Sequence, residues 1–228
     1  MLPLRNLNLI KNVLTDEQIG PVSKTLKENT NIQQIFMSHN RMSVAAMQTL
    51  ADGLKDNKVL TDFFFTHNDL QAGGEGGLSV LKSLANKKDL RSLALNSCNI
   101  NGEYLQELEN SIAGNTELKE LYLFANRIGP DGSKQISAMI KNKAKLTSLG
   151  LSNNKLNDTG CIELAQNGLV GKRFLVKLSF ENNGMGNTAL EAVSASLMDC
   201  QSIQELYLYN NELDDDPIEN FCELLSKQ

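Results

Sequence analysis

Two histidines are the first residues whose type and spacing could support chemistry. His39 and His67 are the only histidines of the 228-residue chain, and they occupy the same slot of two adjacent sequence repeats. Neighbouring strands lie about 4.8 Å apart, so the two rings can approach each other. Zinc, however, takes four ligands, or three and a water molecule. With no acid or thiolate beside them, the histidines predict a solvated pair and no metal site.

A cluster of glycines, Gly73-Gly74-Glu75-Gly76-Gly77, is the second candidate, because glycine-rich loops bind phosphate. No lysine follows the cluster, and Glu75 stands where a phosphate would lie. We therefore expect a two-residue insertion in a surface loop, with a flexible contact loop as the alternative. Phosphate-loop, His-Glu-x-x-His and Gly-x-Ser-x-Gly motifs are absent from the sequence. The chain is accordingly predicted to be no enzyme, with no catalytic residue and no cofactor.

The cysteines and the charge balance exclude further classes of function. Cys98, Cys161, Cys200 and Cys222 lie far apart without a Cys-x-x-Cys pair, which indicates a reducing compartment and a cytoplasmic location. Lys and Arg total 22 against 27 Asp and Glu, which argues against a nucleic-acid partner. No apolar stretch approaches 18 residues, so we expect no membrane association through a spanning helix.

A repeat of about 28 residues supplies the elements that would position any functional group. Residues 118–128 read LxxLxLxxNxL, and the same frame starts at Leu4, Ile32, Leu60, Leu90, Leu118, Leu146, Leu175 and Ile203. The steps are 28, 28, 30, 28, 28, 29 and 28 residues. In all eight copies the apolar slots hold Leu, Ile, Met or Phe. These copies predict a single domain over residues 1–228, without a separate capping module.

The Asn slot of the frame predicts a ladder of hydrogen bonds. It holds Asn in seven copies and Cys98 in the remaining one. An Asn amide both donates and accepts, so stacked Asn side chains can satisfy buried backbone groups of their own and the next turn. Cys98 has only a weak S–H donor, and we expect a tolerated variant of the ladder with no reactive role.

A helical pattern follows each frame. Ile128, Gly132, Ile136 and Ile140 recur every four residues, and acids such as Asp131 and Asp158 stand where helices are expected to begin. Lysines such as Lys143 and Lys172 stand at the expected helix ends, where the helix dipole favours cations. Each repeat is therefore predicted to be a short strand, a tight turn, a helix of some three turns and a return loop. Stacking gives a right-handed α/β horseshoe with a concave parallel sheet and convex helices.

Residues 118–174 match the pattern LxxLxLxxNxLxxxGxxxLxxxL best. This pattern resembles the ribonuclease-inhibitor type of leucine-rich repeat, which also occurs in NOD-like receptors and in the Ran GTPase-activating protein. The resemblance covers essentially the whole chain and implies the horseshoe fold. It implies a general binding platform for function, because a fold does not fix an activity.

The concave face carries the candidate binding residues. Leu slots of each strand point into the core, so the third, fifth and seventh positions of the frame are expected to face the inside of the arc. Six of the 12 Phe and Tyr residues stand in the fifth and seventh columns. Exposed aromatics on a rigid scaffold are common anchors of interfaces, although aromatic pairs across strands also simply stiffen a sheet. The predicted protein-binding residues are Phe36, Phe64, Tyr122, Phe124, Tyr207, Tyr209, Glu120, Glu181 and Glu205.

These residues predict a non-enzymatic interaction module or scaffold subunit. Its partner would be a protein with apolar anchor residues and a basic rim. The chain could also be one part of a larger assembly. The alternative is a GTPase-activating protein of the Ran regulator type. No residue of this sequence is assigned to that activity.

Overall fold

The computed structural model describes residues 3–198, 200–214, 218–219 and 221–223. Eight three-residue strands form one parallel sheet in sequential order. They are β1 (Asn6–Asn8), β2 (Gln34–Phe36), β3 (Asp62–Phe64), β4 (Ser92–Ala94), β5 (Glu120–Tyr122), β6 (Ser148–Gly150), β7 (Lys177–Ser179) and β8 (Glu205–Tyr207). Equivalent frame positions pair across every step, as in Leu93 with Leu121 and Leu121 with Leu149. The predicted repeat register is therefore confirmed.

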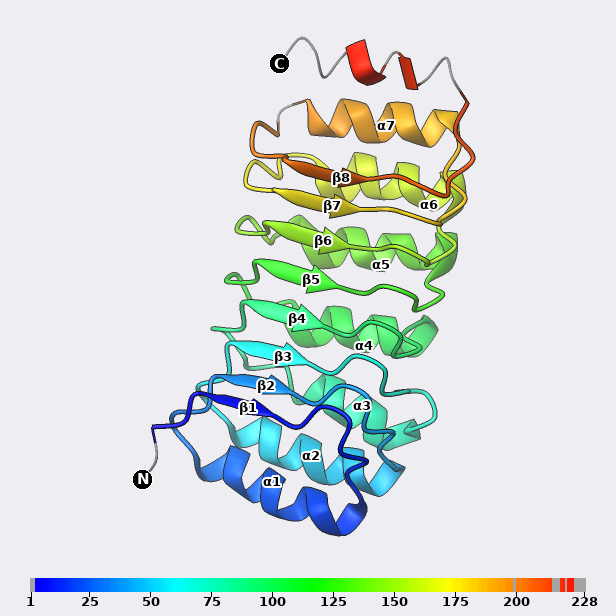
Figure 1. Ribbon diagram of the computed structural model, residues 1–228. Helices are drawn as coiled ribbons and strands as arrows, with labels where there is room; N and C mark the ends of the chain where they lie inside the picture. The colour runs from blue at the N-terminus through cyan, green and yellow to red at the C-terminus, as the bar shows by residue number, and fades with distance from the viewer. Residues whose placement is uncertain (1–2, 199, 215–217, 220, 224–228) are drawn as a thin grey trace.

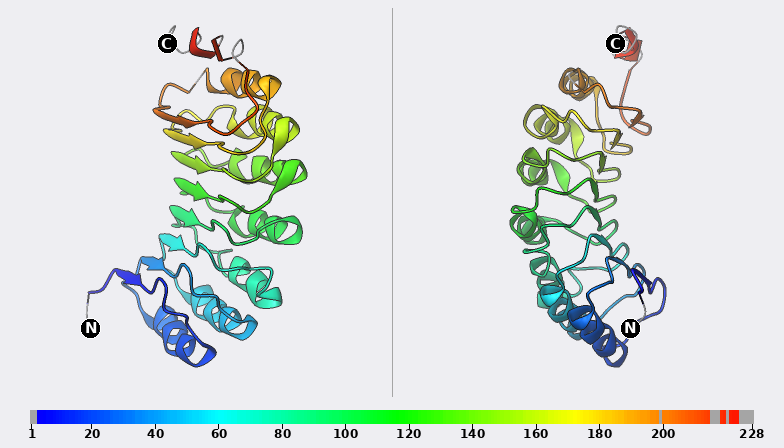
Figure 2. Two further views of the ribbon diagram at one scale, coloured as in Figure 1. Left: turned by 45° about the vertical axis from the view of Figure 1, so that its right-hand side comes forward. Right: turned by 90° about the vertical axis from the view of Figure 1, so that its left-hand side faces the viewer.

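Helices cover one face of this sheet and leave the other open (Figure 1). They are α1 (Asp16–Glu28), α2 (Val44–Asp56), α3 (Gly74–Lys82), α4 (Gly102–Ile112), α5 (Gly129–Lys141), α6 (Asn157–Glu163) and α7 (Asn187–Leu197), with a π-helix η1 (Leu164–Leu169) continuing α6. The stack curves with the helices on its outer side, and the two ends of the chain lie at opposite ends of the arc (Figure 2). This arrangement confirms the α/β horseshoe.

The apolar slots of the frame form one continuous core between the sheet and the helices. In β5 and just beyond it, Leu121 and Leu123 are fully buried, whereas the intervening Tyr122 is half-buried on the opposite face. This alternation follows from the two-residue period of a strand. On the helix side, Ile136 and Ile140 of α5 are also fully buried. The period of two thus gives way to the helical period within each repeat, as the sequence predicts.

The Asn ladder is present, and Asn126 shows its geometry. The Nδ2 group of Asn126 donates to Leu95 O and to Leu123 O, both at 2.9 Å. The Oδ1 atom accepts from the N–H of Cys98 at 2.9 Å, and the N–H of Asn126 donates to Asn154 Oδ1 at 2.9 Å. One amide therefore satisfies backbone groups in two repeats, which explains why the slot requires both a donor and an acceptor.

The two repeats that depart from 28 residues contain the two irregular helices. Helix α3 begins 14 residues after Leu60, whereas α2 begins 12 residues after Ile32, so the two extra residues lie in the turn before α3. In the 29-residue repeat, η1 accommodates the additional residue, since a π-turn contains one residue more than an α-turn. Both helices α3 and α6 are shorter than the three turns predicted, at 9 and 7 residues.

The prediction of a surface loop at the glycine cluster is wrong. Gly76 and Gly77 lie in the first turn of α3 and are buried. A Cβ atom added to Gly76 would lie 2.3 Å from Val44 O, and one added to Gly77 would lie 2.0 Å from Leu70 O. The glycines therefore allow the backbone of α3 to pack against α2 and its own preceding turn.

Candidate functional site

The N-terminal aromatic pair of the concave face is a stack between adjacent strands. The rings of Phe36 in β2 and Phe64 in β3 lie 4.6 Å apart at an interplanar angle of 5°. Both side chains are half-buried. Because each ring covers a face of the other, this pair fits the sheet-stiffening interpretation that the sequence left open.

The second aromatic pair lies over a glycine of the next strand. The rings of Tyr122 and Phe124 are 5.8 Å apart and tilted by 51°. A Cβ atom on Gly150 of β6 would lie 2.1 Å from Phe124 Cε1 and 2.9 Å from Tyr122 Cδ1, so both rings extend across β6. Burial raises the pKa of Tyr122, although a hydrogen bond with Ser148 opposes that shift. The two rings are therefore held by the sheet and still present a half-buried aromatic surface.

The last strand presents a charged aromatic cluster. Lys177 Nζ lies 2.7 Å from Glu205 Oε2 and 4.7 Å from the centre of the Tyr207 ring, and the Tyr207 hydroxyl donates to the same carboxylate at 2.9 Å. The hydrogen bond from Lys177, followed by that from Tyr207, lowers the pKa of Glu205. Tyr209, two residues beyond Tyr207, is 63% exposed and is the most exposed of the predicted anchors.

The predicted acids differ in how well they can meet a partner. Glu205 is exposed, and Glu120 is half-buried and accepts a hydrogen bond from Ser92 at 2.8 Å. Glu181 is only 8% exposed and accepts a hydrogen bond from Ser152 of the preceding repeat. The expectation that Glu181 is open to a partner on the concave face is thus wrong, because Ser152 of the preceding repeat lies against it and donates a hydrogen bond to it.

Known proteins share this architecture and repeat. Leucine-rich-repeat family models match residues 142–165 and 202–224. The ribonuclease inhibitor of Sus scrofa is 24% identical over 98% of this chain and 56% of its own length. The NACHT, LRR and PYD domains-containing protein 3 of Bos taurus is 25% identical over 99% of this chain and 25% of its own length. The chain is built of leucine-rich repeats similar to those of the ribonuclease inhibitor.

The solved structures agree with the fold. A yeast complex of Rad7 and Elc1 contains a chain that matches with a TM-score of 0.59 at 17% identity, covering 97% of this leucine-rich-repeat chain and 60% of that one. The present chain spans about half the length of the porcine inhibitor and a quarter of the bovine protein. Within the part that the structure describes, no helix is long and apolar enough to cross a membrane.

Buried lysines form a second ladder of the leucine-rich repeats, which the sequence analysis missed. Lys143 is 1% exposed, and its Nζ donates to Ile112 O at 2.7 Å and to Asn115 O at 2.6 Å. Lys87 and Lys172 donate in the same way to Leu54 O at 2.5 Å and to Lys141 O at 2.8 Å. Burial lowers the pKa of Lys87 and of Lys143 to about 8. Lys143 and Lys172 therefore lie at helix ends, as the sequence predicts, but both are buried and bind carbonyls at the end of the preceding helix.

The signal for this second ladder is a fixed slot three residues before each frame from the second onward. That slot holds Asn29, Asn57, Lys87, Asn115, Lys143, Lys172 and Cys200. All of these have a side-chain donor, and Asn57 Nδ2 donates to Leu26 O at 2.9 Å, the carbonyl equivalent to Ile112 O. A column of interchangeable Asn, Lys and Cys residues thus indicates a backbone-binding role rather than an exposed one.

Proposed function

We propose that this leucine-rich-repeat protein binds a protein partner on its concave face and catalyses no reaction. The observation that carries the proposal is the aromatic surface of the C-terminal half. There, Tyr122 and Phe124 are held over Gly150 and Tyr209 extends into solvent. Rigid aromatic side chains lose little conformational entropy on binding and supply most of the affinity at protein interfaces. The name of the porcine relative, an inhibitor of ribonuclease, also denotes action on a protein.

The charges on this surface favour a partner with apolar anchors and a basic rim. Glu120 and Glu205 lie two residues before Tyr122 and Tyr207 on their strands, and among the described residues Glu205 forms its one ion pair with Lys177. Basic groups of a partner would approach these carboxylates and compete with Lys177, so the charges orient the complex more than they tighten it. The four free cysteines favour a reducing compartment, such as the cytoplasm, for this activity.

A pair of equally exposed aromatic residues tests the location of the surface. Tyr209 is 63% exposed near the end of β8, and Phe174 is 62% exposed in a loop outside the strands. A photoreactive benzoylphenylalanine at each position, irradiated in native extract, should cross-link a discrete protein from position 209 and not from position 174. The captured protein should then bind Tyr209→Ala at least ~10-fold more weakly than wild type, with Phe174→Ala unchanged. Cross-linking from position 174 alone, or unchanged affinity of Tyr209→Ala, would place the interface elsewhere.

A further inference from the structure

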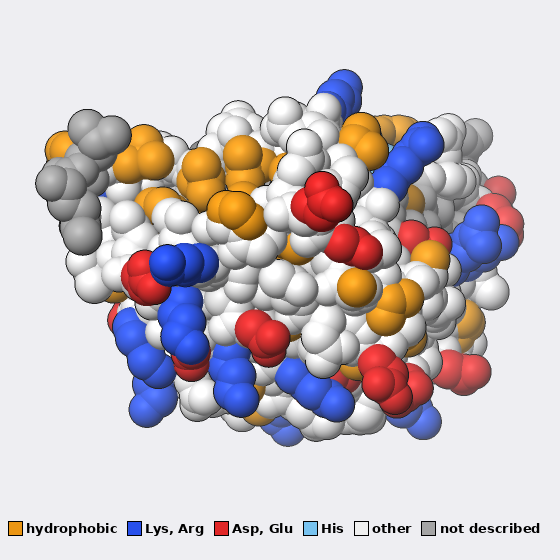
Figure 3. Space-filling view, turned by 90° about the horizontal axis from the view of Figure 1, so that it is seen from below, with side chains coloured by type: hydrophobic (Ala, Val, Ile, Leu, Met, Phe, Trp, Pro, Cys, Tyr) orange, Lys and Arg blue, Asp and Glu red, His pale blue; other side chains and the backbone are white. Residues whose placement is uncertain are grey.

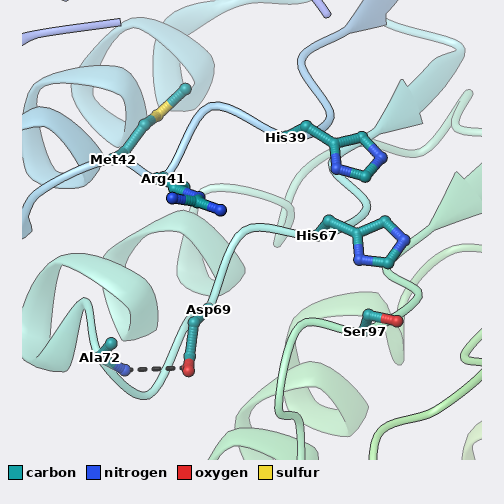
Figure 4. A pocket seen from close by; sticks show the side chains of 7 residues that line it. All are labelled: His39, Arg41, Met42, His67, Asp69, Ala72 and Ser97. Carbon is teal, nitrogen blue, oxygen red and sulfur yellow. Dashed lines mark hydrogen bonds between the residues drawn. The ribbon is translucent and has the colours of Figure 1, made fainter. Parts of the chain in front are cut away.

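The histidine pair borders a pocket at the edge where strands β2 and β3 end (Figure 4). The rings of His39 and His67 lie 4.1 Å apart at an interplanar angle of 19°, so they not only approach each other, as the repeat allows, but stack. Both side chains are exposed. The cavity has a volume of about 370 Å³ and is lined by His39, Arg41, Met42, His67, Asp69, Ala72 and Ser97.

Positive charge gathers at this pocket. Arg41 lines it, and Lys11 lies close enough to act electrostatically on His39. Loss of hydration lowers the pKa of His39, and the charges of His67, Lys11 and Arg41 lower it further. Protonation of the stacked rings thus places charges where they repel each other, and a bound anion would relieve that repulsion.

The acid of the pocket is engaged away from the rings. Asp69 Oδ1 accepts a hydrogen bond from the N–H of Ala72 at 3.0 Å, in the turn that precedes α3, and one from Asn99 Nδ2 at 3.4 Å. Figure 4 shows this carboxylate directed toward Ala72 while the imidazole rings stand on the other side. Among the described residues no three His, Cys, Asp or Glu side chains gather to hold a metal ion. The pocket therefore suits an anion better than a cation.

The backbone holds these side chains in place at the pocket. His39, Arg41 and His67 have φ values of 61°, 47° and 59°, in the left-handed region. The N–H groups of His39 and His67 donate at 2.9 Å to Thr66 O and Asn96 O of the following repeats. Each imidazole therefore stands on a turn fixed by its neighbour, and little ordering of the backbone is required when a ligand binds.

We propose that this pocket binds a phosphate group through Arg41 and the imidazolium groups of His39 and His67. A guanidinium group presents two parallel N–H donors to phosphate oxygens, and the Ser97 hydroxyl lines the same cavity as a further donor. Binding of the anion and protonation of His39 are linked, so the affinity rises as the pH falls and His39 takes up its proton.

Nuclear magnetic resonance of the imidazole groups tests the site directly, because the chain has only two histidines. Sodium phosphate would be titrated into the full chain at pH 6 and pH 8, with the ionic strength held constant by sodium chloride. The Hε1 signals of both rings should shift saturably at pH 6, binding should weaken at pH 8, and the pKa of His39 should rise in the presence of phosphate. Shifts that are linear in phosphate, or that chloride reproduces, would overturn the proposal.

Matched variants distinguish binding at this site from a general effect of positive charge on the protein. Arg41→Gln should weaken phosphate binding ~10-fold, whereas Arg127→Gln should leave it unchanged, although Arg127 has the same frame position and a similar φ of 58°. His39→Asn and His67→Asn assign the two signals, and each should weaken binding measured by calorimetry. Asn is a suitable replacement because Asn153 and Asn182 occupy the same slot with φ values of 59° and 53°. Equal effects of Arg41→Gln and Arg127→Gln would contradict a localised site.

Discussion

At the scale of single residues, the slots of the frame that face the core accept fewer residue types than the slots that face solvent. Asn126 makes four ladder hydrogen bonds at 2.9 Å, and no other side chain of its size combines two amide donors with an acceptor. Cys98 is the exception: its Sγ reaches Phe65 O at 3.3 Å but provides no amide oxygen for the N–H of Asn68. Burial raises the pKa of this thiol to about 12, so the slot is chemically inert.

Restoring the ladder at Cys98 should stabilise the protein. In Cys98→Asn the new amide can donate to Phe65 O and Leu95 O and accept from Asn68, as Asn126 does one repeat later. Because a net intramolecular hydrogen bond contributes about 1 kcal/mol, we expect the free energy of unfolding to rise by that amount in urea titrations.

Cys161 provides the matched control for this substitution. It is also fully buried, and burial also raises its thiol pKa to about 12, but it lies inside α6 and outside both ladders. Cys161→Asn buries an amide without partners and should destabilise the protein by about 1–3 kcal/mol. Destabilisation of similar size by both substitutions would show that the ladder slot has no special preference for Asn.

Single residues also show which parts of the candidate site can be predicted from the sequence. Tyr209 stands exposed where its column predicts, because the position depends only on the alternation of one strand. The burial of Glu181 depends on Ser152 of the preceding repeat, and the placement of Phe124 depends on the missing side chain of Gly150 in the following repeat. A prediction made from one frame position at a time treats the side chains as independent, and it therefore misses contacts between side chains of neighbouring repeats.

At the scale of the secondary-structure elements, the ends of α1, α2, α4 and α5 are each bound by a side chain of a following repeat. Lys87, Lys143 and Lys172 direct their ammonium groups to carbonyls at the ends of preceding helices, where the helix dipole is negative. Asn57 binds the equivalent carbonyl at the end of α1, that of Leu26. The helix lengths themselves were predictable from the apolar period, except in the two longer repeats, where α3 is shortened and α6 gives way to the π-helix η1.

The lysine ladder should make stability depend on pH in the alkaline range. Burial lowers the pKa of Lys143 from 10.5 to about 8 in the folded chain. Between those values the unfolded chain binds more protons than the folded one, so the free energy of unfolding rises with pH over this window and is unaffected by this group below it. Lys143→Asn should remove part of that rise, by as much as about 3 kcal/mol between pH 8 and pH 10.5.

Urea titrations of the wild type and two variants at pH 7, 8, 9 and 10 measure this effect. Lys145→Asn is the control, because Lys145 is exposed and forms an ion pair with Glu117 at 2.6 Å. The ionisation of tyrosine and cysteine is common to all three proteins and cancels in the differences. Parallel curves for the wild type and Lys143→Asn would mean that Lys143 stays protonated on its carbonyls up to its ordinary pKa.

At the scale of the whole molecule, a repeat at the end of the stack has fewer neighbours than a repeat in the middle. Each inner strand pairs with two neighbours, whereas β1 pairs only with β2. Viewed from below, a broken band of hydrophobic side chains crosses this end, with Lys and Arg side chains along one edge (Figure 3). Leu4, Ile10 and Val13 are 47%, 37% and 65% exposed, whereas the residues equivalent to Leu4 in the inner repeats are buried. Within the described residues, the N-terminal repeat thus packs against a neighbouring repeat on one side.

The final prediction is that this asymmetry makes the first repeat open most readily in the isolated protein. The stability of a solenoid is a sum of intrinsic repeat terms and interface terms, and an end repeat lacks one interface. Ile19 and Leu26 of α1 are fully buried, so the repeat should be folded but should open with a lower free energy than the inner repeats. Hydrogen exchange followed by mass spectrometry should therefore show faster exchange of helical amides over residues 16–28 than over residues 129–141. Both segments form 13-residue α-helices, which makes them a matched pair. Equal protection of α1 and α5 would show that the stack opens as one cooperative unit and that its ends are as stable as its middle.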